Sequence, residues 1–242
     1  MSSTTWTRRA VESEAAPLAL TVWRAVEAQH VVATRALVDS LAEQALLEQI
    51  LDAAKPRLPL AAAKLHYLLA TPFRYPTLPR GSRFRAPHDP GVFYGADEQR
   101  TAFAELGYWR WRFLRDSPAL TALEARPQTV FRVGLKTARA IDLRSAPFRK
   151  SAATWKDPGN YAGCQRLALH ARAARIEVIR YESVRDPLHA GAAAVLAPAA
   201  FTAVEPLDSQ TWSLAITRTH AIWQRQSANT RAAFEFAFAD AA

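Results

Sequence analysis

The amino-acid sequence predicts an α+β fold, and three observations carry that prediction. Apolar residues recur at helical spacing near the start of the chain, whereas most later apolar runs are short and strand-like. The few later helices are scattered among those runs, an order typical of α+β domains. Half of the 242 residues are apolar, including 7 Trp and 11 Phe, which is enough for a packed core. We expect an N-terminal helical extension over residues 1–58 and one larger domain over residues 59–242.

The extension is expected to contain two helices. Residues 1 to about 15 are expected to be frayed, and the stretch 18–38 places Val22, Val26 and Val32 at helical spacing. Ser40 followed by Glu43 has the spacing of a capping box and predicts a second helix that ends before Pro56. This pair of helices is expected to form a separate lobe that either packs on the main domain or serves a partner.

The larger domain is expected to contain mostly short strands. Asp97 is expected to cap a helix over residues 97–115, the longer of the two helices predicted in this domain. The predicted helices cover residues 97–115 and 161–174, and the predicted strands cover residues 65–69, 92–95, 129–140, 176–181, 192–197, 211–217 and 221–223.

Charge and composition narrow the class of partner. The net charge is +9, and only five of the 31 basic residues are lysine. Arginine suits two-pronged recognition of phosphate or carboxylate, although a GC-rich coding sequence explains the same bias. The single cysteine, Cys164, excludes a disulfide framework and every Cys-rich zinc pattern. With no run of about 18 apolar residues and no export signal at the start, a soluble protein of the cytoplasm is expected.

Several common kinds of site have no counterpart in the sequence. No two glycines bracket a single residue, so the Gly-x-Gly fingerprint of dinucleotide-binding Rossmann folds is absent, and so is a Walker loop. The sequence also contains no His-Glu-x-x-His and no Gly-x-Ser-x-Gly. The six histidines are scattered without metal-ligand spacing, so no metal site is expected. If a dinucleotide binds, it does so without a Rossmann fold, and redox use of it is not expected.

A set of polar and aromatic residues remains as the candidate site. Arg74, Arg83, Tyr94 and Glu105 fall on segments expected to be loop, strand and helix, and Ser183-Val184-Arg185 follows much later. A phosphate-bearing ligand with a planar ring and a glycosidic bond to cleave requires groups of these kinds.

Each of these residues also has a structural alternative. Glu105 lies on an apolar helix face where it could pair with Arg112, and the two arginines could be solvated. Tyr94 alternates with Phe93 in a short strand, so one of the two faces the core.

The segment Tyr108-Trp109-Arg110-Trp111-Arg112-Phe113 suggests nucleic-acid binding, because aromatic and arginine side chains can stack on bases. On a helix, however, these side chains point in every direction and form no platform. A basic nucleic-acid-binding module therefore stands as an alternative function, together with a catalytically inactive interaction module.

Taken together, these motifs resemble the RES domain, a family named for its Arg, Glu and Ser. Glu105 follows Arg83 by 22 residues, and Tyr181-x-Ser183-Val184-Arg185 completes the pattern. A difference is Glu182, where the family has proline. The resemblance covers roughly residues 60–200 and includes Thr71-Pro72-Phe73-Arg74-Tyr75-Pro76, Gly81-Ser82-Arg83-Phe84, Phe93-Tyr94-Gly95 and Ala104-Glu105.

The resemblance implies a toxin of a toxin–antitoxin pair, with an ADP-ribosyltransferase-like mixed β core and flanking helices. The implied substrate is NAD+, whose nicotinamide–ribose bond is cleaved by hydrolysis, by phosphorolysis or by ADP-ribosyl transfer to a protein. The implied partner is an Xre-type DNA-binding antitoxin that occludes the active site, and a homodimer within the complex is expected.

The resemblance also implies roles for the site residues. Glu105 would stabilise an oxocarbenium-like transition state, and Arg74 and Arg83 would hold the pyrophosphate. Tyr94 would stack on the nicotinamide ring, Ser183 would bind its amide or ribose, and Arg185 is a further candidate for phosphate.

Overall fold

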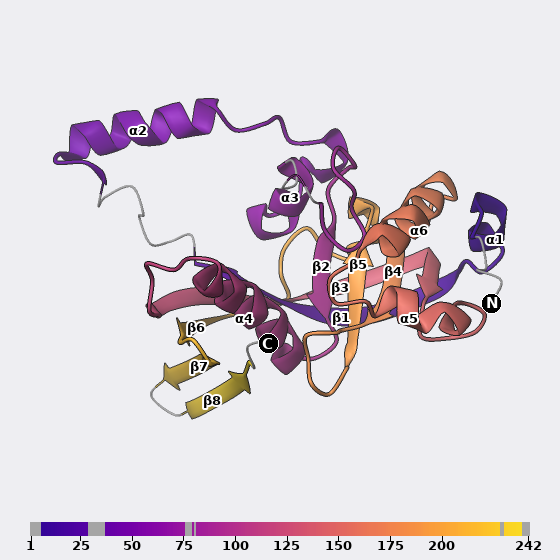
Figure 1. Ribbon diagram of the computed structural model, residues 1–242. Coiled ribbons are helices and arrows are strands. Elements are labelled where there is room, and N and C mark those ends of the chain that lie inside the picture. Colours follow the sequence, from indigo (N-terminus) through magenta and orange to yellow (C-terminus); the bar gives the residue numbers. More distant parts are fainter. Residues whose placement is uncertain (1–5, 29–36, 76–78, 80, 228–229, 239–242) are drawn as a thin grey trace.

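The computed structural model describes residues 6–28, 37–75, 79, 81–227 and 230–238. These residues form one eight-stranded, mostly antiparallel sheet with helices around it (Figure 1). The α+β prediction is confirmed. The strands, in chain order, are β1 (Ala16–Glu27), β2 (Phe93–Ala96), β3 (Leu123–Asp142), β4 (Val178–Glu182), β5 (Gly191–Val195), β6 (Asp208–Ile216), β7 (His220–Ser227) and β8 (Thr230–Ala237).

The sheet curls back on itself at one end. Its strand order is β1-β2-β5-β4-β3-β6-β7-β8, and β1 pairs along most of its length with β3 as well. Five strands therefore close into a ring, and β6, β7 and β8 continue from β3 as a flap. Among the strands in the described part of the chain, β3 and β4 are the only neighbours that run parallel. The helices are α1 (Arg8–Glu12), α2 (Leu41–Ala53), α3 (Tyr67–Arg74), α4 (Gln99–Arg115), α5 (Ala152–Trp155) and α6 (Ala162–Ala173), with 3₁₀ turns η2 (Leu60–Ala62), η3 (Phe148–Ser151) and η4 (Pro198–Ala200).

The predicted helix over residues 18–38 is wrong, because residues 16–27 form strand β1. Val22 and Val26 are four residues apart, a spacing that fits a strand face as well as a helix face. Leu18, Leu20 and Val22 alternate with more exposed residues, and the long antiparallel pairing with β3 satisfies the backbone of this segment. Val32 lies outside the described residues.

Three further corrections concern the ends of elements and short segments. The strand predicted over residues 65–69 is wrong, because α3 begins there with the His66 side chain accepting a hydrogen bond from the amide of Leu68 at 3.3 Å. Short apolar runs do not separate strand from helix. Asp97 does not cap α4, since the N-cap is Glu98 without a side-chain hydrogen bond. Residues 8–12, expected to be frayed, form α1, and Val11 is buried in the core.

The remaining predicted helices and strands are confirmed, although β3 begins six residues before the predicted strand over residues 129–140, and α5 and β8 were not predicted. The capping box is present, since Ser40 Oγ accepts from the Glu43 amide at 3.2 Å and Glu43 Oε2 accepts from the Asp39 amide at 2.9 Å. None of the helices in the described ranges is long and apolar enough to span a lipid bilayer.

Helix α4 is held in place by an aromatic cluster beneath the flap. Phe103 is fully buried and stacks on Trp223 with ring centroids 4.2 Å apart, and its edge meets Trp212 at 4.8 Å. This packing fixes the rotation of α4 about its axis. Glu105 and Leu106, two and three residues after Phe103, therefore face the ring of strands.

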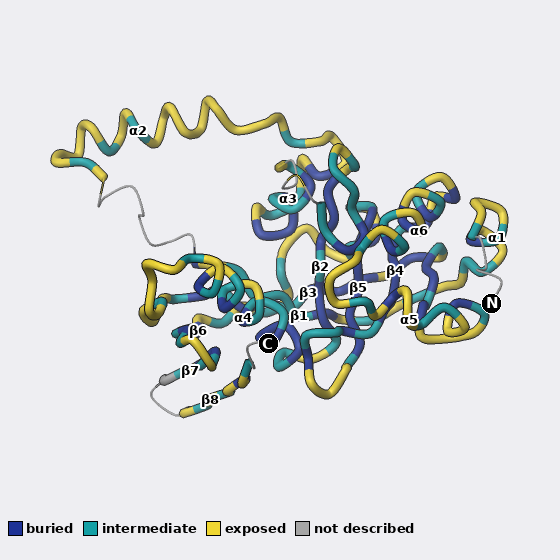
Figure 2. The backbone as a smooth tube through the Cα atoms, viewed as in Figure 1, coloured by how far each residue is buried: buried dark blue, intermediate teal, exposed yellow. Residues whose placement is uncertain are grey.

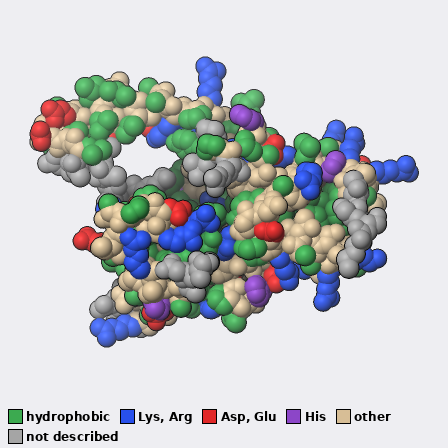
Figure 3. Space-filling view, viewed as in Figure 1, with side chains coloured by type: hydrophobic (Ala, Val, Ile, Leu, Met, Phe, Trp, Pro, Cys, Tyr) green, Lys and Arg blue, Asp and Glu red, His purple; other side chains and the backbone are tan. Residues whose placement is uncertain are grey.

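Helix α2 stands apart from this core. It contains no buried residue, and Leu46 and Ile50 are 57% and 56% exposed. Figure 2 shows α2 exposed along its length, and Figure 3 shows hydrophobic side chains along it. Within residues 1–58, α1 and α2 are therefore helical, while β1 belongs to the sheet.

Candidate active site

A cleft of about 250 Å³ opens between α4 and the ring of strands. Its walls come from segments far apart in the sequence, because β1 pairs with β2 here. Helix α4, which follows β2 directly in the chain, forms the opposite wall. The residues that line it are Trp23, Arg24, Ala25, Ser82, Arg83, Tyr94, Gly95, Ala96, Ala102, Glu105, Leu106, Trp109, Tyr161, Tyr181, Arg185 and Ala192.

Four of the six candidate site residues meet on the wall of this cleft. They are Arg83, Tyr94, Glu105 and Arg185. Ser183 is fully buried and lies behind Glu105 rather than on the wall. Arg74 lies elsewhere: it ends α3, its Nε donates to the carbonyl of Pro56 at 2.6 Å, and it borders a separate hollow.

Glu105 is held by a short hydrogen bond from Ser183. Ser183 Oγ donates to Glu105 Oε1 at 2.6 Å, so the alternative pairing of Glu105 with Arg112 is not what the structure has; Arg112 faces Asp116 instead. Burial raises the pKa of Glu105, and the hydrogen bond from Ser183 and the nearby positive charges of Arg185 and Arg83 oppose that rise. The site therefore contains a partly desolvated carboxylate flanked by two cations.

Tyr94 faces the cleft because its neighbour Phe93 faces the core, as strand alternation predicts. Its hydroxyl is paired with Ser82 Oγ at 2.7 Å and accepts from the amide of Phe84 at 2.9 Å. Burial raises the pKa of Tyr94 to about 12, against the effect of these hydrogen bonds. The hydroxyl thus fastens the turn that carries Arg83, while the ring is presented to the cleft.

Arg83 is 8% exposed and divides its contacts between the protein and the cleft. Its Nη1 donates to the carbonyls of Trp155 at 2.7 Å and Asp157 at 3.0 Å. The guanidinium carbon also lies 4.7 Å from the centre of the Tyr161 ring, a cation–π distance. These contacts hold a permanent positive charge at the cleft wall.

Arg185 sits on the aromatic side of the cleft. Its guanidinium carbon lies 3.7 Å from the centre of the Tyr108 ring. Its Nη2 donates to Tyr161 Oη at 3.2 Å and to the carbonyl of Pro158. The residue before Ser183, Glu182, points away from this side and pairs with Lys156 at 2.6 Å.

Arg24 is a cleft residue that the sequence interpretation missed. It lies on β1, donates from Nη1 to the carbonyl of Tyr94 at 2.7 Å, and places its guanidinium 4.8 Å from the centre of the Phe93 ring. Burial lowers its pKa to about 10, partly offset by Tyr94 and Tyr181. Among the described residues, its buried Nε has no hydrogen-bond partner. The available signal was a charged residue on the same strand face as the buried Val22.

Comparisons with known proteins identify a family and a similar fold. A family model described as the RES domain matches residues 57–217, which is more than half of the chain. The fold is similar to a chain in the crystal structure of the M. tuberculosis MbcT–MbcA toxin–antitoxin complex, with a TM-score of 0.51 and 11% sequence identity over 84% of this chain and 90% of that one. None of the curated proteins matches the sequence.

Proposed function

The chain belongs to the RES domain family, and from that premise we propose that it is the toxin of a toxin–antitoxin pair and cleaves the nicotinamide–ribose bond of NAD+. The observation that carries the proposal is the convergence of Arg83, Tyr94 and Glu105 in one cleft. We also propose that the ring of strands is the ADP-ribosyltransferase-like core that the resemblance implies.

The cleft supplies the groups that this cleavage needs. The bond between ribose C1′ and the nicotinamide nitrogen breaks, its electron pair stays on nitrogen, and nicotinamide departs neutral without needing a general acid. Positive charge then develops on the ribose, and the carboxylate of Glu105 stabilises it. Addition of water gives ADP-ribose and a proton, addition of phosphate gives the 1-phosphate, and addition of a protein side chain gives a modified protein.

The other cleft residues orient the substrate. Arg83 and Arg24 offer guanidinium groups to the pyrophosphate. Arg24 thus takes the role that the sequence interpretation gave to Arg74. Tyr94 offers its ring to the nicotinamide. Ser183 acts through Glu105, because its hydroxyl is committed to that carboxylate and the residue is fully buried.

The proposed partner is a DNA-binding antitoxin of the Xre type. The support is the family together with the structural neighbour, which is a chain of a toxin–antitoxin complex. Direct nucleic-acid binding has less support, since Trp111 is buried, Trp109 and Phe113 are exposed, and the aromatic residues of α4 present no common face.

The test is mass spectrometry of the products after the purified protein is incubated with NAD+, with and without phosphate. We expect free nicotinamide in both reactions. Free ADP-ribose, its 1-phosphate or a modified protein identifies the acceptor as water, phosphate or a side chain. Intact NAD+ under all conditions, from protein shown to be folded and with a cell extract also supplied as a source of acceptor proteins, would exclude the proposal.

Arg24 lines the cleft and Arg74 does not, and this difference gives a quantitative prediction. Arg24→Ala is expected to raise the KM for NAD+ about tenfold, because it removes a cleft guanidinium. Arg74→Ala is expected to change KM less than about twofold, because its side chain binds the carbonyl of Pro56 outside the cleft. Initial-rate measurements of nicotinamide release decide it, and the reverse order of effects would contradict the assignment.

A further inference from the structure

Two residues of the turn after β4, Ser183 and Asp186, bind side chains of α4. Thr101 and Glu105 stand four residues apart on α4 and therefore share a face. Ser183 Oγ donates to Glu105 Oε1 at 2.6 Å, and Thr101 Oγ1 donates to Asp186 Oδ2 at 2.7 Å. The second contact lies away from the cleft wall, because neither Thr101 nor Asp186 lines it.

The hydroxyl of Ser183 has one direction in which it can donate. Its oxygen accepts from the amides of Arg185 at 3.3 Å and Asp186 at 3.1 Å. With both amides on the oxygen, the hydroxyl hydrogen is directed to Glu105. The orientation of the turn relative to α4 therefore decides whether this hydrogen reaches the carboxylate.

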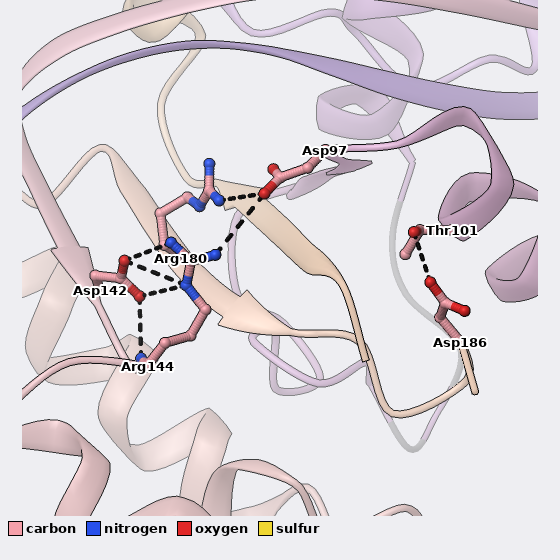
Figure 4. Close-up of polar contacts among 6 residues, drawn as sticks. All are labelled: Asp97, Thr101, Asp142, Arg144, Arg180 and Asp186. Atoms are coloured by element: carbon pink, nitrogen blue, oxygen red, sulfur yellow. Dashed lines mark hydrogen bonds and ion pairs between the residues drawn. The ribbon is translucent and has the colours of Figure 1, made fainter. Parts of the chain in front are cut away.

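Asp186 is the anchor of that turn. It is fully buried, and its Oδ1 accepts from Arg100 and from the amide of Leu188 at 3.1 Å. Its Oδ2 accepts from Thr101, which is the contact drawn in Figure 4. Burial opposes its ionisation, but these hydrogen bonds hold the pKa of Asp186 below its ordinary value. Within the turn, the amide of His189 also donates to the Asp186 carbonyl at 2.8 Å.

The start of α4 is fixed independently. Asp97, just before the helix, pairs with Arg180 of β4, and Arg180 is 6% exposed (Figure 4). The helix and the turn are thus both connected to β4, and the Thr101–Asp186 contact joins them to each other.

We propose that Asp186 and Thr101 are positioning residues that aim the Ser183 hydroxyl at Glu105. The expected effect on nicotinamide release rests on the proposed function. The geometric part concerns the hydrogen bond to Glu105 and can be measured without any turnover.

The primary experiment compares Thr101→Val with the wild-type protein. The charged and titratable groups around Glu105 are Arg83, Arg185, Asp186 and Tyr181, and this substitution replaces none of them. It removes one hydrogen bond that lowers the pKa of Asp186, and a less ionised Asp186 would lower the pKa of Glu105, which is opposite to the rise expected here. Loss of the Ser183 hydrogen bond removes an influence that lowers the pKa of Glu105. A rise of about half a pH unit or more is expected in a carbon-13 NMR titration of labelled glutamate, assigned with Glu105→Gln.

The kinetic readout is the pH profile of nicotinamide release. Thr101→Val is expected to lower kcat about tenfold with KM within about twofold, and to move the acidic limb to higher pH. Thr101→Ser keeps the hydroxyl and is expected to restore both. The matched control is Thr137→Val, which removes the same kind of buried hydrogen bond, from Thr137 to Glu177 at 2.6 Å, outside the cleft wall.

The outcomes separate the inference from the proposed function. An unchanged pKa of Glu105 in folded Thr101→Val would overturn the inference, whatever the protein catalyses. Equal kinetic losses in Thr101→Val and Thr137→Val would overturn it as well, since only general stability would then matter. A wild-type protein that releases no nicotinamide, combined with the expected shift in pKa, would reject the proposed function and leave the positioning intact.

Discussion

Replacing Glu105 with glutamine is expected to lower nicotinamide release at least about a hundredfold, because the neutral amide cannot stabilise positive charge on the ribose. The amide oxygen can still accept from Ser183 Oγ, which lies 2.6 Å from the carboxylate, so the shape of the cleft is retained. The loss should therefore fall on kcat rather than KM. Glu98→Gln, an exposed change at the N-cap of the same helix, is the matched control and should keep wild-type rates.

The same substitution is expected to leave stability unchanged or raise it, which separates a catalytic loss from unfolding. The pKa of Glu105 is raised by burial in the folded protein, so at neutral pH the ionised carboxylate disfavours folding. Stability from this group is present when it is protonated and is lost as pH rises through the raised pKa. Glutamine removes that cost. A melting temperature well below wild type, or full turnover by the variant, would contradict the role assigned to Glu105.

The sequence predicted the core of the site better than it predicted the fold around it. Arg83, Tyr94 and Glu105 lie within one short stretch, where the turn, β2 and α4 follow one another directly. Elements that follow one another directly in the chain keep their residues close in space, independently of how the rest of the chain folds. Their convergence therefore depended on few assumptions, and the cleft contains all three.

Arg24 shows where such reasoning ends. It reaches the cleft because β1 pairs with β2 at Trp23 and Ala96 and with β3 along its length. Pairing between strands distant in sequence is decided by side-chain packing across the sheet, which spacing within one segment does not reveal. Since Val22 and Val26 also fit a helix, the segment was assigned to the wrong element and its arginine was overlooked.

Ser183 and Asp186 illustrate a second limit. A serine near a carboxylate was expected to bind ligand directly, but the structure buries it completely and gives its hydroxyl to Glu105. The sequence does not record which polar residue becomes buried, because that depends on how the turn after β4 meets α4. In the sequence, nothing distinguishes Asp186 from a surface aspartate, and only the structure reveals its contact with Thr101.

Arg83 is expected to show a loss of both activity and stability, unlike Glu105. Its Nη1 binds two backbone carbonyls, those of Trp155 and Asp157, and removal of the side chain leaves them without this donor. Arg83→Ala should therefore lower the free energy of unfolding by about 1–3 kcal/mol. It should also lower kcat/KM about a hundredfold, because the cleft loses a fixed positive charge.

Arg83→Lys separates these two effects. Lysine keeps the charge but lacks the planar fork, so it cannot serve the two carbonyls and a phosphate together. We expect an intermediate loss of about tenfold in kcat/KM, carried mainly by KM. The matched control is Arg85→Lys in the same turn, since Arg85 binds the carbonyls of Asp89 and Tyr75 and does not line the cleft. If Arg83→Lys and Arg85→Lys had equal effects on KM, residue 83 would serve only to hold the turn, and the anion-binding role would belong to Arg24 and Arg185.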